Sequence, residues 1–180
     1  REYREVQAFN ADRGDGWLNL GSLEARRGNP SAAEAAYLRG MRQEASFIPL
    51  YLNLADLYRS EGREADCERV LRDALVKYPG SADAHHSLGL TLIRSKRTDQ
   101  AVAELRAAAE AAPQNARYAF VLALALDTIG RHDEAYASMK AAHERFTGDR
   151  DILSALLAWS ARAGDQDSVA IWQKKLDDLD

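Results

Sequence analysis

The chain has 180 residues, of which 46% are apolar and 29% are charged, and its formal net charge is −4. Because acidic and basic residues are both spread along the chain, a dedicated nucleic-acid surface is not expected, since such surfaces show a basic stripe. No run of eighteen apolar residues occurs, so no membrane-spanning helix is predicted. Cys67 is the single cysteine, which excludes a disulfide within the chain.

Leucines that recur every 34 residues are the main signal along the chain. A fixed period of this length, with small residues at constant helical offsets, is typical of stacked helix–turn–helix units. The leucines are Leu20, Leu54, Leu88, Leu122 and Leu156, and the small residues include Ala33, Cys67, Ala101 and Ala135. The sequence therefore predicts an all-α solenoid of antiparallel helix pairs, with five units at 14–47, 48–81, 82–115, 116–149 and 150–180.

Residues 1–13 continue the same pattern towards the start of the chain. Tyr3 stands one period before Tyr37, and Val6 stands one period before Gly40. We therefore predict that residues 1–13 form the second helix of a truncated leading repeat. The chain is accordingly expected to be part of a longer protein.

The second unit shows how each helix pair is expected to form. Apolar residues at helical spacing from Leu50 to Tyr58 predict a first helix that runs to Ser60. Gly62 suits the left-handed turn that ends such a helix. The second helix is expected to stop before Pro79, because a residue that precedes proline is disfavoured in a helix.

A set of aromatic, small and proline residues marks fixed places in the period: Trp17, Leu20, Gly21, Ala33, Tyr37, Pro79 and Pro113. Together these residues resemble the tetratricopeptide repeat (TPR), and the resemblance covers residues 14–180. It implies a right-handed superhelix whose concave inner surface is lined by the first helix of each unit. Glu24 departs from the resemblance, because the family usually has a large aromatic residue at that place.

The concave surface is the predicted interaction site. Equivalent positions on the first helices provide the candidate groove residues Asn19, Arg26, Asn53, Asp56, Arg59, His86, Arg94, Arg117, Phe120 and Asp127. Asn19 and Asn53 are one period apart, and a ladder of amides suits an extended peptide because each amide carries donors and an acceptor. Arg26, Arg94 and Arg162 also share one offset, which is equally expected of cations that complement the C-terminal dipoles of their helices.

No catalytic, metal or cofactor chemistry is expected. His85 and His86 are adjacent, but neither has a second ligand at i+4 or a cysteine pair nearby, so no zinc site is predicted. His85 is expected to pack between units and His86 to face the groove. Cys67 stands at a small-residue position and is expected to be a buried hydrophobic residue. The sequence therefore indicates a non-enzymatic protein.

The function expected from these features is that of a scaffold that binds a peptide or helix of a protein partner in its groove. TPR domains that hold chaperone C-termini use a clamp of Lys and Asn. Here the clamp positions hold Leu18, Ser22, Asn53, Asp83 and Ser87. Only Asn53 fits, which argues against that partner.

The alternative expectation is an assembly module without a groove ligand. Trp172, Leu176 and Leu179 follow the final turn with no helix after them, and Tyr3 and Val6 stand at the other end. Apolar ends of this kind would pair with another chain.

Three stretches carry a second resemblance: NLADLYRSEGR, DAHHSLGLTLIR and PQNARYAF. They are similar to the C-terminal TPR tails of bacterial multihaem cytochrome c-type proteins. This resemblance implies a bacterial origin and a periplasmic location, whereas the rest of the sequence leaves the cytoplasm and the periplasm equally open.

Overall fold

The computed structural model describes residues 14–179, and in that part of the chain ten helices and no strand are present. The helices are α2 (Gly14–Arg26), α3 (Pro30–Gln43), α4 (Ile48–Ser60), α5 (Glu64–Lys77), α6 (Ala82–Arg94), α7 (Thr98–Ala111), α8 (Ala116–Thr128), α9 (His132–Arg145), α10 (Arg150–Ala163) and α11 (Gln166–Asp177). The helix predicted for residues 1–13 lies outside the described residues.

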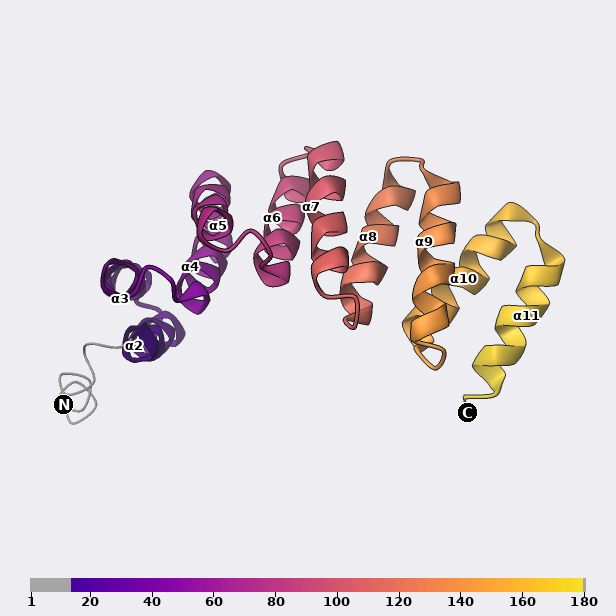
Figure 1. The fold of residues 1–180 in the computed structure, drawn as a ribbon, viewed down its shortest axis with the longest axis horizontal. Coiled ribbons are helices and arrows are strands. Elements are labelled where there is room, and N and C mark those ends of the chain that lie inside the picture. Colours follow the sequence, from indigo (N-terminus) through magenta and orange to yellow (C-terminus); the bar gives the residue numbers. More distant parts are fainter. Residues whose placement is uncertain (1–13, 180) are drawn as a thin grey trace.

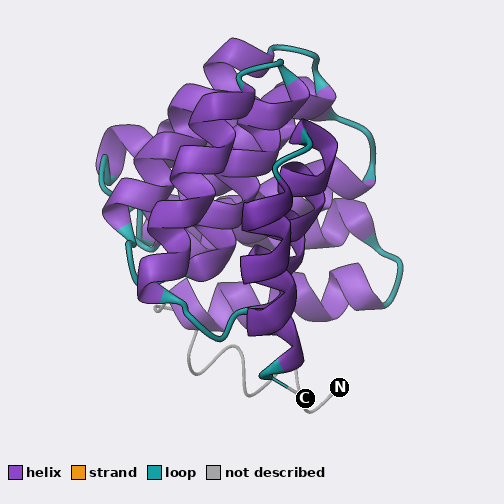
Figure 2. Cartoon of the chain, turned by 90° about the vertical axis from the view of Figure 1, so that its right-hand side faces the viewer, coloured by secondary structure: helices purple, strands orange, loops and turns teal. Residues whose placement is uncertain are grey.

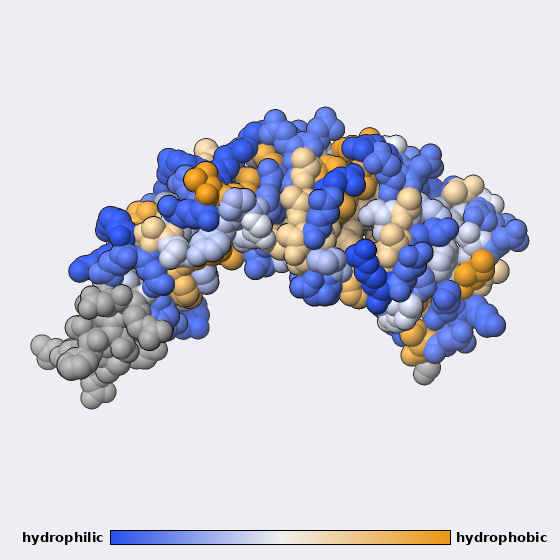
Figure 3. All heavy atoms as spheres, viewed as in Figure 1, coloured by the Kyte–Doolittle hydropathy of each residue, from blue (hydrophilic) through white to orange (hydrophobic). Residues whose placement is uncertain are grey.

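The helices follow one another along an arch in chain order, with α2 and α11 at its opposite ends (Figure 1). Each helix packs on its neighbours in sequence, and α4 also contacts α2 and α6. Figure 2 shows the same stack from one end, and Figure 3 shows that the arch is hollowed along one long side. The structure is therefore the predicted all-α solenoid, held together by contacts between neighbouring elements.

Helix α4 shows why these segments are helical. Leu50, Leu54 and Tyr58 are at most 3% exposed, and their spacing places them on one face of the helix. The helix ends at Ser60, as predicted, and Gly62 follows with a φ of 72°. This left-handed conformation costs glycine little because it lacks a Cβ atom.

Small residues allow the two helices of a unit to approach closely. A Cβ atom on Gly21 would lie 2.2 Å from the ring of Tyr37. A Cβ atom on Gly89 would lie 2.7 Å from Cγ of Leu105 and 3.3 Å from the carbonyl oxygen of Ala101. Gly89 thus lies against the backbone of Ala101, and its nearest neighbour is the leucine side chain one turn further along α7.

Ion pairs join consecutive units at the edge where the turns lie. Arg63 binds Glu34 at 2.8 Å, and one period later Arg97 binds Glu68 at 2.7 Å. The bond from Arg63 lowers the pKa of Glu34, and bonds from Arg72 and then Arg97 lower the pKa of Glu68, in both cases against the opposing effect of burial. Because these pairs are partly exposed, each contributes little to stability. We attribute to them mainly the orientation of neighbouring units.

The C-terminal end differs from the expectation of an exposed apolar face. Trp172 is only 7% exposed, because its indole lies edge-on against His143 and donates a hydrogen bond of 3.1 Å to the hydroxyl of Tyr136. The prediction that Trp172 is available for pairing is therefore wrong. Ile171 and Leu179, which are 52% and 40% exposed, are the apolar side chains that this end presents.

Candidate functional site

The candidate site is the hollow side of the arch. At the two ends of the arch, α2 and α10 lie nearer to the hollow than their partners α3 and α11 (Figure 1). Because α4 also contacts α2 and α6, consecutive first helices lie close together, as helices on the inside of a curve do. The first helix of each pair thus supplies this inner surface.

The N-terminal part of the inner surface is polar. Arg26, Asn53 and Asp56 meet there, with Ser22, around a cavity of about 480 Å³ between α2 and α4. The Nδ2 atom of Asn53 donates a hydrogen bond of 2.9 Å to the carbonyl oxygen of Pro49. Since an amide carries two N–H donors and a carbonyl, this bond uses only part of its capacity.

Two of the predicted residues lie beside this cavity without lining it. Asn19 is exposed on α2, whereas Asn53 is half-buried on α4. The two amides of the expected ladder therefore differ in exposure. Arg59 forms an ion pair of 2.9 Å with Asp56, one turn away on the same helix. The carboxylate of Asp56 is therefore already balanced by a cation of its own helix.

His86 takes a different place from the one expected. Its side chain is 9% exposed, and its ring lies 4.8 Å from the ring of Tyr118 on α8. The Tyr118 hydroxyl donates to the carboxylate of Asp83, and burial followed by this bond raises the pKa of Tyr118 to about 12. Burial, with the nearby charge of Arg117, lowers the pKa of His86. His86 is thus a neutral packing residue between α6 and α8.

Helix α8 adds apolar side chains to the inner surface. Arg117, Phe120 and Val121 line a cavity of about 330 Å³ whose rim also carries Asp149 and Asp151. One turn further along the same face of α8, Leu124 is 40% exposed. Its offset, one period after Leu90, also places Leu124 on the inner side, and its exposure adds it to the candidate groove residues. A partner would meet amides and charges at one end and apolar side chains at the other.

The arginines at the shared offset do not act alike. Arg94 binds Glu64 of the preceding unit with bonds of 2.7 and 3.2 Å, and Arg162 binds Asp127 of the preceding unit at 3.0 Å. The bond from Arg162 lowers the pKa of Asp127, against burial and together with His132. These two arginines therefore join units. Arg26 forms no ion pair with the described residues and remains available to a ligand.

The adjacent histidines and the cysteine have packing roles. His85 binds the Glu104 carboxylate at 2.7 Å and the Pro79 carbonyl at 2.8 Å, so it ties α6 to α7 and to the turn before it. Cys67 is 2% exposed, its Sγ lies 3.3 Å from the Thr91 hydroxyl, and burial raises its pKa. Within residues 14–179 no group of three or more His, Cys, Asp or Glu side chains is placed to hold a metal.

The arch, the helix pairs and the inner surface together define an α-solenoid built from helix–turn–helix repeats. Residues 58–125 match the sequence model of the family described as tetratricopeptide repeat. The same solenoid fold continues on both sides of this match over the described residues, so the chain has the fold of a tetratricopeptide repeat solenoid.

Two curated proteins resemble the chain. The TPR repeat-containing protein YpiA of Bacillus subtilis (strain 168) is 24% identical over 141 residues, which are 78% of this chain and 33% of YpiA. The uncharacterised protein y4yS of Sinorhizobium fredii (strain NBRC 101917 / NGR234) is 38% identical over 79 residues, which are 44% of this chain and 43% of y4yS. The chain thus spans less than half the length of these relatives, and both sources agree with the expected bacterial origin.

Solved structures share the fold at low sequence identity. MamA from Desulfovibrio magneticus RS-1 aligns with a TM-score of 0.73 and 22% identity over 92% of this chain and 94% of MamA. YrrB, described as a TPR protein with an unusual peptide-binding site, aligns with a TM-score of 0.72 and 18% identity over 99% of this chain and 92% of YrrB. In residues 14–179 no helix combines the length and apolar character that crossing a bilayer requires.

Proposed function

We propose that the chain is a non-enzymatic scaffold that binds a peptide or helix of a partner protein along its concave surface. The observation that carries the proposal is the graded inner surface. The amide of Asn53 and the charges of Arg26 and Asp56 lie at its N-terminal part, and the exposed Leu124 lies on α8. A peptide would orient itself on such a surface, with polar groups towards α4 and an apolar side chain towards α8. The peptide-binding site named for YrrB, which shares the fold, supports this use of the solenoid.

Charge indicates the kind of peptide. Asp56 and Asp127 are each paired with an arginine, whereas Arg26 and Arg117 form no ion pair with the described residues. The preferred ligand therefore carries carboxylates that reach these two arginines. Because Asp149 and Asp151 lie beside Arg117, a uniformly acidic peptide is disfavoured. We expect a ligand of mixed charge.

The test is a selection of peptides from a random library on the 180-residue chain, followed by affinity measurements on variants. Asn53→Ala and Leu124→Ala should each weaken a selected peptide by about 1–3 kcal/mol, because interface energy concentrates on a few contacts. Val76→Ala is the matched control, since Val76 is an 80% exposed apolar residue on the outer helix α5. Equal losses from the inner and outer variants would contradict the proposal.

Glu104 illustrates why an outer position must be chosen with care. Its carboxylate binds Nδ1 of His85 at 2.7 Å, so Glu104→Ala would remove a contact between α6 and α7. The melting temperature of each variant should therefore be measured beside its affinity.

Self-association through the C-terminal end is the second candidate function. Ile171 and Leu179 are the observation in its favour, because both are exposed on or next to the last helix. Sedimentation velocity over a range of concentrations tests it. A concentration-dependent dimer that Ile171→Glu abolishes would support assembly, and a single monomeric species at all concentrations would contradict it.

A further inference from the structure

A cluster of side chains lies at the joint between the first two units. Its contacts can be compared with those of the equivalent residues at a later joint. Cζ of Arg63 lies 4.1 Å from the centroid of the Tyr58 ring. The same guanidinium binds Glu34 at 2.8 Å, and the Tyr58 hydroxyl donates to Glu34 at 2.7 Å. An aromatic ring, a guanidinium and a carboxylate thus fill this joint.

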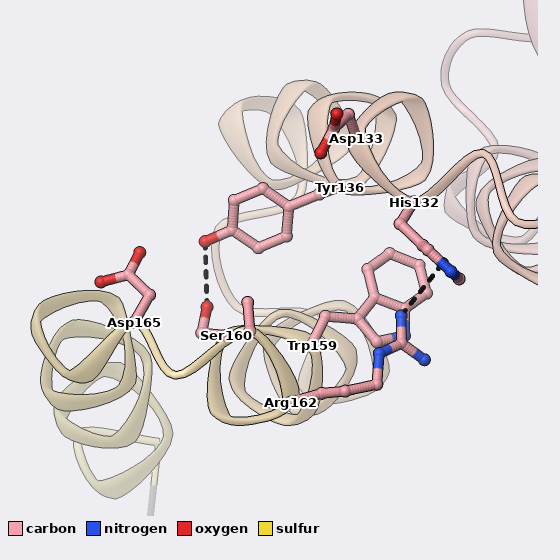
Figure 4. Close-up of a pocket in the computed structure, with 8 residues that line it drawn as sticks. His132, Asp133, Tyr136, Trp159, Ser160, Arg162 and Asp165 are labelled. Atoms are coloured by element: carbon pink, nitrogen blue, oxygen red, sulfur yellow. Dashed lines mark hydrogen bonds between the residues drawn. The ribbon is translucent and has the colours of Figure 1, made fainter.

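The joint between α9 and α10 carries different residues at these three places. Three periods after Tyr58 and Arg63 stand Ser160 and Asp165, and three periods after Glu34 stands Tyr136. A small hydroxyl replaces the ring, and a carboxylate replaces the guanidinium. The structure has a cavity of about 520 Å³ at this joint, on the edge where the turns lie (Figure 4).

Two aromatic side chains form the walls of this cavity. Tyr136 comes from α9 and Trp159 from the facing helix α10 (Figure 4). The Tyr136 oxygen lies 3.0 Å from Oγ of Ser160 and accepts a hydrogen bond of 3.1 Å from Nε1 of Trp172. These two contacts fix the ring, so the wall is formed before any ligand arrives.

The charges at the rim favour a cation. Asp133 and Asp165 line the cavity, and no ion pair with a described residue balances either of them. Arg162 and His132 also line it, but both bind the carboxylate of Asp127. The remaining cation is Lys140, whose Nζ lies 5.9 Å from the centroid of the Tyr136 ring, at the outer limit of a cation–π contact. Two carboxylates without an ion pair among the described residues thus line the cavity, and the arginine that lines it is already bound to Asp127.

We propose that this cavity is a second recognition site, which takes the guanidinium of an arginine side chain from a partner protein. The guanidinium would lie between Tyr136 and Trp159 and pair with Asp165, and so reproduce between two chains the contact that Arg63 makes within one. Arginine fits better than lysine, because a planar guanidinium stacks on aromatic rings and is more weakly hydrated than an ammonium group. The site stands three repeats after the cavity between α2 and α4 and is lined by other residues, so it does not depend on peptide binding at Asn53.

The test uses a short peptide, Ac-Gly-Arg-Gly-NH2, titrated into the ¹⁵N-labelled chain. The indole N–H signal of Trp159, assigned with Trp159→Phe, should shift and saturate with a Kd on the order of millimolar, as a single side chain allows. The isosteric but uncharged citrulline peptide should bind at least about fivefold more weakly, because the charge–ring and charge–carboxylate attractions are lost. A lysine peptide that shifts the signal equally would overturn the assignment to arginine.

Two variants test the place of binding. Ser160→Tyr restores the residue found at the first joint and should fill the cavity, so that the saturable shift disappears. Asp165→Asn removes the charge but keeps a side chain that can cap α11, and should weaken binding several-fold. Asn53→Ala should leave binding unchanged. The proposal would be contradicted if Asp165→Asn bound the arginine peptide as tightly as the unchanged chain, or if Asn53→Ala weakened that binding. Neither result depends on whether a peptide binds on the concave surface.

Discussion

Lys96 is the residue whose conformation departs from its equivalents. The turns inside the other four described units place Gly28, Gly62, Gly130 and Gly164 in the left-handed conformation, with φ between 72° and 79°. Lys96 holds the same place one period after Gly62, with a φ of 57°. In this conformation the Cβ atom of a residue other than glycine clashes with the backbone, which raises the energy of the turn.

Replacing Lys96 by glycine should therefore stabilise the chain. The free energy gained by removing the clash exceeds the free energy lost because glycine is more flexible in the unfolded state. The net gain in the free energy of unfolding is about 0.5–1 kcal/mol. Denaturant unfolding measures this gain. Gly62→Ala is the reciprocal control and should destabilise by about 1 kcal/mol. A lower stability of Lys96→Gly would show that the turn is not strained.

At the scale of helices, two buried histidines hold neighbouring elements together. His86 joins α6 to α8 through Tyr118, and His143 joins α9 to α11 through Trp172. Nδ1 of each histidine is buried and has no hydrogen-bond partner among residues 14–179. Burial lowers the pKa of both, with help from Arg117 for His86 and from Lys175 for His143, while Asp83 and Glu144 oppose the shift.

Mild acid should therefore loosen these contacts. A histidine whose pKa is lower in the folded state than its unfolded value of 6.5 stabilises the fold above pH 6.5, and this contribution is lost as the pH falls below that value. Each histidine should contribute a slope of up to about 1.4 kcal/mol per pH unit in this range. Denaturant unfolding between pH 7.5 and 5 at constant ionic strength, conditions chosen to bracket the histidine range, measures the slope.

The matched variants are His86→Phe and His143→Phe, which keep an aromatic ring but cannot take up a proton. Each should flatten part of the slope above pH 5, as expected from the histidine titration range. The carboxylates of Glu34, Glu68 and Asp127, whose pKa is lowered by arginine, lose their contribution only at lower pH. An unchanged slope in both variants would assign the pH dependence to other groups.

The helices themselves could be predicted because their signals are local. Ser60 ends α4 as predicted, and α5 ends at Lys77, before Pro79. Contacts between units could not be predicted in the same way. The burial of Trp172 depends on Tyr136 and His143, which lie about one period earlier in the sequence and carry no signal of their own.

At the scale of the whole molecule, each unit is supported by its neighbours alone. Helix α7 packs between α6 and α8, whereas α11 packs mainly on α10. In such a one-dimensional stack, a terminal element has fewer interfaces to hold it. Local opening should therefore be easier at the end than in the middle.

Native-state hydrogen exchange tests this prediction. Amides of α11 should open with a free energy at least about 1 kcal/mol lower than those of α7. Exchange at the end should remain faster in the variant Ile171→Glu, which controls for self-association. Equal protection of the two helices would indicate a single cooperative core.

The candidate site could be predicted in outline but not in detail. Asn53, Arg26 and Phe120, which their offsets in the repeat assign to the inner side, line cavities in the structure. His86 and Arg94 had the right offset, but the first is buried by Tyr118 and the second is bound by Glu64. The position of a residue in the repeat determines the face of the helix on which it lies. Whether its side chain is free to bind a ligand depends on partners from the neighbouring unit.

The central claim is that a partner binds on the inner surface. A library-selected peptide titrated into the ¹⁵N-labelled chain tests it most directly, by mapping the amide signals that move. The account predicts the largest shifts on the first helices α4 and α8, around Asn53, Arg117 and Leu124. Shifts centred on the outer helices α5 and α7, or on Ile171 and Leu179 at the end of the arch, would contradict it.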